Sequence, residues 1–127
     1  MTDLPPYADL LQLRAQERDD GSVQFVMPWH DDVMGRPQFL HGGAIAGLLE
    51  FAAYETLRRA VRGERTTMKP ITVTVNYMLG GRDLETYADA VVERLGRSLA
   101  NVEAFAWQQD RGRPIASARI NFLLDRA

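Results

Sequence analysis

The segment from His41 to Leu57 constrains this chain most strongly, because it reads HGGAIAGLLEFAAYETL and is apolar on nearly every side of a helix. Its apolar positions recur with the i, i+3, i+4, i+7 spacing of one helix face. The other side is scarcely more polar, and a helix of this kind is usually buried. The residues on the predicted face are Ala44, Ile45, Leu48, Leu49, Ala52, Ala53 and Leu57. The sequence therefore predicts a fold organised around one buried helix.

Glu50 places a carboxylate in this apolar run. We interpret it as the single carboxylate of the helix. The residues one turn before and after it are mostly small, which leaves room for a cleft above the side chain. Burial of an unpaired carboxylate is costly, and such groups are often functional. Two structural alternatives remain open: Glu50 faces solvent at the one polar edge of the helix, or it pairs with an arginine from another element.

Gly42 and Gly43 place backbone N–H groups where the helix is predicted to begin. The first four N–H groups of a helix have no partner inside it, and this end attracts negative charge. Glu50 lies about two turns further on, at a rise of ~1.5 Å per residue. A carbonyl held by the Gly42 N–H would therefore reach Glu50 only along a groove, or Glu50 would come from a second copy of the chain.

Period-two patterns and turn residues predict mainly antiparallel strands around this helix. One long helix beside such a sheet is an α+β arrangement, and a sheet curled around the helix would explain its all-round apolarity. The predicted elements are a short helix at 5–13, a hairpin at 13–28, a loop at 29–40, and strands at 71–78, 84–95, 99–109 and 114–124.

Composition limits the class of protein. A chain of 127 residues forms one domain, 1–127, with a core that needs no metal or disulfide. It has no cysteine, which excludes thiol nucleophiles and thiolate metal sites. The 15 basic and 17 acidic residues create no field that attracts nucleic acid. We expect a cytoplasmic protein with no membrane span, because there is no run of 18 apolar residues and no signal-peptide pattern.

His30, Asp31 and Asp32 are the group of residues that most resembles a metal site. Three adjacent side chains point in different directions, however, and no second cluster completes a coordination shell. We therefore expect no metal and no cofactor.

The run LHGGAIAGLLE, with an acid nine positions after the histidine, resembles the hotdog-fold acyl-CoA thioesterases of the phenylacetic-acid and 4-hydroxybenzoyl-CoA type. The segments VNYM at 75–78, GRSLA at 96–100 and RGRPIASA at 111–118 are similar as well, so the resemblance spans residues 21–124. It implies a curved, mostly antiparallel sheet wrapped around the central helix. It also implies hydrolysis of an acyl-CoA thioester to the free acid and CoA, without a metal.

The resemblance assigns roles to three residues. The Gly42 amide would polarise the thioester carbonyl, and His41 would shape the loop that positions this donor. Glu50 would be the nucleophile, or the base that activates water. The site in this family lies between two subunits, so Gly42 and Glu50 would come from different chains of a homodimer or a dimer of dimers.

Further candidate substrate-binding residues surround these three. Many relatives have Asn or Gln six positions before the histidine, where this chain has Gly35, and Gln38 is the amide that could replace it. Tyr54 occupies a position where some relatives have Thr, and Gly43 adjoins the proposed donor. The remaining candidates are Thr72, Thr74 and Asn76, which share one side of their strand, and Arg97, Arg36, Arg111 and Arg113, which could bind the phosphates of CoA.

Other functions remain open from the residues alone. Because Gly35 lacks the amide of many relatives, a non-catalytic binder of acyl-CoA or another acyl ligand is the main alternative. A hotdog dehydratase is a third, although its usual Asp and His spacing is not visible. The acyl group is undetermined, since Trp29, Phe39, Leu40 and Phe51 predict a lining that fits aryl and medium-chain acyl groups equally.

Overall fold

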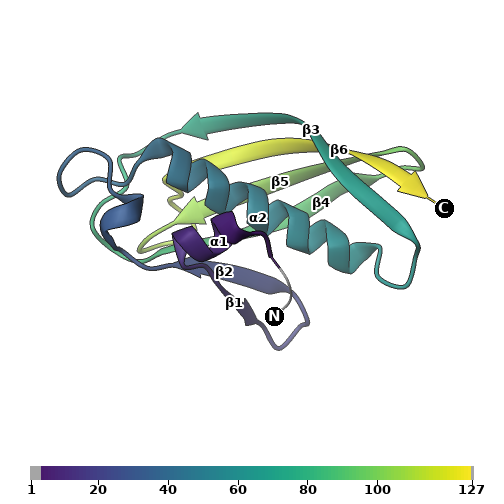
Figure 1. The fold of residues 1–127 in the computed structure, drawn as a ribbon, viewed down its shortest axis with the longest axis horizontal. Helices are drawn as coiled ribbons and strands as arrows, with labels where there is room; N and C mark the ends of the chain where they lie inside the picture. Colours follow the sequence, from purple (N-terminus) through teal and green to yellow (C-terminus); the bar gives the residue numbers. More distant parts are fainter. Residues whose placement is uncertain (1–3, 127) are drawn as a thin grey trace.

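A single curved antiparallel sheet carries the long helix α2 across its concave face (Figure 1). The computed structural model describes residues 4–126. The strand order is β1-β2-β4-β5-β6-β3, and every neighbouring pair is antiparallel. This arrangement confirms the predicted α+β hotdog fold. In chain order the elements are α1 (Pro6–Leu11), β1 (Arg14–Glu17), β2 (Val23–Met27), the 3-10 helix η1 (Asp31–Val33), α2 (Gly42–Ala60), β3 (Thr66–Tyr77), β4 (Thr86–Leu95), β5 (Leu99–Trp107) and β6 (Ala116–Arg126).

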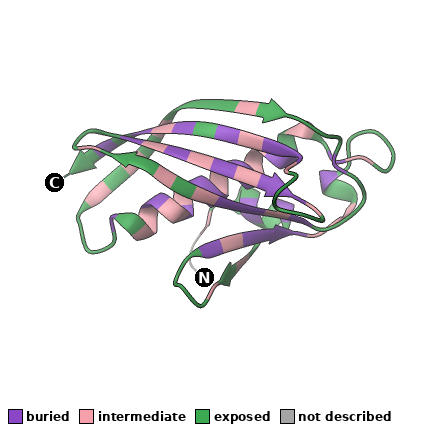
Figure 2. Cartoon of the chain, turned by 180° about the vertical axis from the view of Figure 1, so that it is seen from behind, coloured by how far each residue is buried: buried purple, intermediate pink, exposed green. Residues whose placement is uncertain are grey.

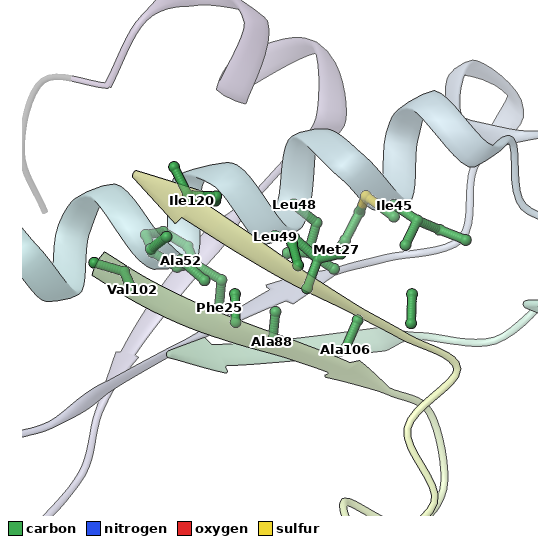
Figure 3. Packing of buried hydrophobic residues seen from close by; sticks show 14 of the residues in the cluster. Phe25, Met27, Ile45, Leu48, Leu49, Ala52, Ala88, Val102, Ala106 and Ile120 are labelled. Atoms are coloured by element: carbon green, nitrogen blue, oxygen red, sulfur yellow. The ribbon is translucent and has the colours of Figure 1, made fainter. Parts of the chain in front are cut away.

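The predicted apolar face of α2 forms the centre of the core, and all seven of its residues are buried. Leu48, Leu49 and Ile45 pack against Phe25 and Met27 of β2 (Figure 3). The strands that lie beneath the helix present small side chains, so the helix can approach the sheet closely. These small buried residues are Ala88, Ala104, Ala106, Ala116 and Ala118. Burial alternates with exposure along the strands, as the period-two pattern predicts (Figure 2).

Strand β3 begins at Thr66, and the predicted start at residue 71 is therefore wrong. Its first residues pair with the end of β6, from Thr66 opposite Arg126 to Pro70 opposite Phe122. The register shifts at Pro70, where β3 forms the edge of the sheet and a missing N–H is tolerated. The charged residues after α2 concealed this strand, because its formation depends on long-range pairing with β6.

Glu55 is the carboxylate that the sequence analysis overlooked. It is fully buried, whereas Glu50 is only half-buried, so the interpretation of Glu50 as the single carboxylate of the helix is wrong. Arg58 donates to both Glu55 oxygens, with Nε–Oε1 at 2.8 Å and Nη2–Oε2 at 2.6 Å. Arg59 donates to Glu55 Oε2 at 3.0 Å and to Glu17 Oε2 of β1 at 2.6 Å. This ionic network lies in the last turns of α2 and links the end of the helix to the first hairpin.

Candidate active site

His41 caps the start of α2 and determines which backbone N–H group remains free. Its Nδ1 accepts the Gly43 N–H at 2.8 Å, and its carbonyl accepts the N–H groups of Ala44 at 3.0 Å and Ile45 at 3.2 Å. Among the described residues, no acceptor is bound by the Gly42 N–H. The cap therefore satisfies the neighbouring donors and leaves Gly42 as the donor available at the positive end of the helix.

Tyr77, at the end of β3, fixes the same turn from the other side. Its hydroxyl donates to the Gly42 carbonyl at 2.9 Å, and a Cβ atom at Gly42 would lie 3.4 Å from its ring. Tyr77 was not among the residues of this strand predicted to reach the site. The alternation of side chains along the strand could have indicated Tyr77, because it shares the inner side of the strand with Val73 and Val75.

Thr72, Thr74 and Asn76 lie on the outer face of the sheet, away from α2. Each is paired with a β6 residue of the outer face, at Asn121, Arg119 and Ser117 respectively. The Thr72 hydroxyl accepts a hydrogen bond from Asn121 Nδ2 at 2.7 Å. Within one chain, the structure thus separates these three residues from α2 and Glu50.

Gly35 packs directly against the cap. A Cβ atom there would lie 3.0 Å from the Cα of His41, and the Gly35 N–H donates to the Phe39 carbonyl at 2.8 Å. The backbone of His41 thus leaves little room for a side-chain amide at position 35. Gln38 is exposed at the tip of the same loop with a φ of 69°. Arg97 lies between β4 and β5. The turn between these strands is at the opposite end of the sheet from the start of α2 (Figure 1).

Glu50 opens onto a mainly apolar pocket of about 430 Å³. Within residues 4–126 its carboxylate has no ion pair or hydrogen bond. The ring of Tyr54, one turn further along α2, lies 6.4 Å from that of Phe122. Of the predicted aromatic lining, Phe51 reaches this pocket and Trp29, Phe39 and Leu40 do not. The lining residues, which we call the Glu50 pocket, are Leu4, Pro5, Glu50, Phe51, Tyr54, Pro70 and Phe122.

His30, Asp31 and Asp32 do not come together as metal ligands, and no group of three such side chains occurs in the part of the chain that is described. His30 Nε2 instead donates to the Leu11 carbonyl at 3.1 Å and links the loop to α1. Between residues 4 and 126, no helix has the length and apolarity needed to cross a membrane.

Replacing His41 by alanine should remove the cap and destabilise the protein by about 1 kcal/mol, the usual effect of losing a side-chain N-cap. His41→Asn should keep most of the stability, because asparagine is a strong N-cap residue. Urea unfolding of both variants measures the difference. Equal free energies of unfolding for the two variants would contradict a capping role for the His41 side chain.

The fold and this site together define a class. A curved antiparallel sheet wraps the long helix α2. Within residues 4–126, the glycine-rich start of this helix has an N–H group with no acceptor, and its apolar middle has a carboxylate with no partner. Residues 37–115, more than half of the chain, match the family model described as the thioesterase superfamily. The chain belongs to the thioesterase superfamily, which confirms the predicted thioester hydrolase. The narrower phenylacetic-acid or 4-hydroxybenzoyl-CoA type stays a prediction.

Solved structures share this fold across nearly the whole chain. The BH2602 protein from Bacillus halodurans, crystallised with CoA, has 23% identity and a TM-score of 0.87, and the match covers 98% of this chain and 81% of that one. A protein from Chromobacterium violaceum has 30% identity and a TM-score of 0.76, with 93% and 82% covered. A variant of thioesterase PA1618 from Pseudomonas aeruginosa has 26% identity and a TM-score of 0.84, with 95% and 86% covered. A comparison with curated proteins returns no match.

Proposed function

We propose that this thioesterase hydrolyses acyl-CoA at a site formed by two copies of the chain, with the Gly42 N–H of one copy as oxyanion donor and Glu50 of the other as nucleophile or base. The observation that carries the proposal is the half-buried Glu50 carboxylate, which lies in its apolar pocket and has no partner among the described residues. A carboxylate held there without a cation is available for chemistry. The CoA in the Bacillus halodurans structure supports CoA as the thiol part of the substrate.

The Gly42 N–H would bind the thioester oxygen and stabilise the negative charge that develops on it. In one route Glu50 takes a proton from water, the water oxygen bonds to the carbonyl carbon, and the C–S bond breaks to release CoA thiolate, which then gains a proton. In the other route the Glu50 carboxylate attacks the carbon and expels the thiolate, and water then hydrolyses the resulting mixed anhydride. Both routes use the same two groups.

Two features support a shared site. Gly42 and Glu50 are eight residues apart in α2, which corresponds to about 12 Å along the helix and is too far for one chain to act on a single carbonyl. Strand β3 also forms an edge of the sheet, paired with β6 on one side only. An exposed apolar edge of this kind favours association with another chain. The exposed apolar residues of β3 are Ile71, Val73 and Tyr77, and Met78 and Leu79 follow directly after the strand.

The Glu50 pocket supports an aryl or medium-chain acyl group. Its volume of about 430 Å³ lies within the usual range for small-ligand sites, and three of its seven lining residues are aromatic. The rings of Tyr54 and Phe122, which lie close together, and the ring of Phe51 would contact the acyl group. The acyl part would thus lie in the pocket while the thioester reaches the partner's helix start.

Gly42→Pro tests the oxyanion donor directly. Proline is well tolerated at the first residue of a helix, and the extended His41 backbone, with ψ of 135°, suits a following proline. The substitution therefore removes the N–H with little change in the fold. We expect kcat for release of free CoA thiol to fall by about 10²- to 10³-fold.

Gly42→Ala is the matched control, because it keeps the N–H and its Cβ would make an ordinary 3.4 Å contact with Tyr77. Equal kcat values for the proline and alanine variants would rule out the Gly42 N–H as donor. Tight CoA binding without turnover by the unmodified protein would instead favour the non-catalytic binder, which the missing amide at Gly35 keeps open.

A further inference from the structure

Two arginine side chains contact the ring of Phe39, just before the start of α2. The guanidinium carbons of Arg36 and Arg82 lie 4.5 and 4.9 Å from the centroid of its ring. Contact with an aromatic face holds a guanidinium group without using its N–H donors. No ion pair formed within residues 4–126 includes either arginine, and both residues are exposed. The two therefore form a cationic surface whose side-chain donors have no partner among residues 4–126, and we call them the arginine pair.

Local contacts hold the backbone of Arg82 and the ring of Phe39, which both guanidinium groups contact. The Gln108 side chain bonds both backbone groups of Arg82: Oε1 accepts its N–H at 3.0 Å, and Nε2 donates to its carbonyl at 3.0 Å. Phe39 and Arg82 form a β-bridge, and the Phe39 ring rests on the backbone of Gly80, where a Cβ atom would lie 3.2 Å from it. Because the Phe39 ring already holds both guanidinium groups, binding an anion here would require only a small further loss of side-chain entropy.

Backbone hydrogen bonds also hold the short segment between Phe39 and the proposed oxyanion donor, Gly42. The Leu40 N–H donates to the Gly81 carbonyl at 2.9 Å, and the His41 N–H donates to the Val33 carbonyl at 2.8 Å. Phe39 and Gly42 are three residues apart, so their Cα atoms are separated by at most about 11 Å. The ring that the arginine pair contacts therefore belongs to the same short segment as the N–H group that would bind the thioester oxygen.

We propose that Arg36 and Arg82 bind the phosphate groups of CoA, which orients the thioester toward Gly42; this inference rests on the proposed function. Guanidinium groups match phosphate oxygens with paired hydrogen bonds. A pantetheine arm separates the phosphates from the thioester, so an anion site displaced from the reacting carbonyl is what a CoA ester requires. A hollow of about 370 Å³ beside Arg82, which Arg113 and Asp110 also line, offers space for the nucleotide.

Two other arginines named from the sequence, Arg111 and Arg97, fit this role less well. Arg111 is already engaged, because its Nε and Nη2 donate to the two carboxylate oxygens of Asp89, each at 2.9 Å. Arg97 lies at the far end of the sheet. Arg82 was missed because it is 46 positions from Arg36, and only the bridge between Phe39 and Arg82 brings them together.

Calorimetric binding of CoA itself tests the proposal without turnover. In the double variant Arg36→Gln/Arg82→Gln, we expect the Kd for CoA to rise by about 100-fold, which corresponds to roughly tenfold for each lost charge-assisted bond. The Kd for pantetheine, which has no phosphate, should stay unchanged. The control Arg65→Gln/Arg94→Gln removes the same charge at two exposed arginines and should bind CoA like the unmodified protein.

Dephospho-CoA identifies the phosphate that is bound. If its Kd rises in the double variant by the same factor as that of CoA, the arginine pair binds the diphosphate; if only CoA is affected, it binds the 3′-phosphate. An unchanged Kd for CoA, or equal weakening of CoA and pantetheine, would overturn the proposal. Activity gives an independent readout: the KM for acyl-CoA should rise with kcat nearly unchanged, and acyl-pantetheine should be unaffected. Absence of hydrolysis in the unmodified protein would refute the proposed function while the CoA binding data still test this site.

Discussion

Glu50→Gln should lower kcat for acyl-CoA hydrolysis by about 10²- to 10⁴-fold, the range associated with a general base. The amide keeps the size of the side chain and cannot take a proton from water or attack the carbonyl. Stability should be unchanged or slightly higher, because the half-buried carboxylate has no described partner to lose. Release of free thiol from a panel of acyl-CoA esters, together with thermal unfolding, measures both effects.

Glu93→Gln is the matched control, since Glu93 is exposed on β4 and the same charge is removed. It should hydrolyse acyl-CoA at the unmodified rate. If Glu50→Gln and Glu50→Ala both retain full kcat, Glu50 has no catalytic role and the pocket is only a binding cavity.

A mixing experiment determines which copy supplies each group. When Glu50→Gln and Gly42→Pro chains are unfolded together and refolded at equal amounts, random pairing makes half of the dimers mixed, and each mixed dimer has one intact site if the site is shared. Activity should then recover to about one quarter of that of the unmodified protein, as expected for a two-fold symmetric interface. If each site lies within one chain, the mixture stays as inactive as its two components.

Removing the partners of Glu55 should have the largest effect on stability. The double variant Arg58→Ala/Arg59→Ala leaves a fully buried carboxylate without its cations. The loss of partners from a buried ion pair typically costs about 3–5 kcal/mol. Urea unfolding at neutral pH should show this decrease. Arg62→Gln/Arg65→Gln, at two exposed arginines nearby, is the control and should change stability little.

In the Arg58→Ala/Arg59→Ala variant, the contribution of Glu55 to the pH dependence of stability should change sign. In the unmodified protein burial raises the pKa of Glu55, but the hydrogen bonds and charges of Arg58 and Arg59 outweigh burial and hold the pKa below its usual 4.5. The Glu55 contribution is therefore complete above about pH 4.5 and is lost as the pH falls through the lowered pKa. Without the arginines burial alone acts and raises the pKa above 4.5, so stability should be lost as the pH rises from that value. A decrease in stability only on the acidic side in both proteins would contradict this account.

The helix and its two candidate catalytic groups could be predicted from the sequence because they depend on local spacing. The period of 3.6 residues determined the buried face of α2, and the glycines after His41 marked its start. The nine-residue interval from His41 to Glu50 is also a property of one helix. The alternation of apolar and polar residues predicted the faces of β5 and β6 for the same reason.

Tertiary structure decided what depends on contacts between distant segments. Pairing with β6 extended β3 back to Thr66 and directed Thr72 to the outer face and Tyr77 to Gly42. The spacing of Glu55 from its two arginines was visible in the sequence, but its complete burial follows from packing against the sheet. A bridge between Phe39 and Arg82 created the arginine pair. Periodicity fixes which face of an element is apolar, whereas the strand order fixes which residues meet across it, and that order depends on the free energy of the whole sheet.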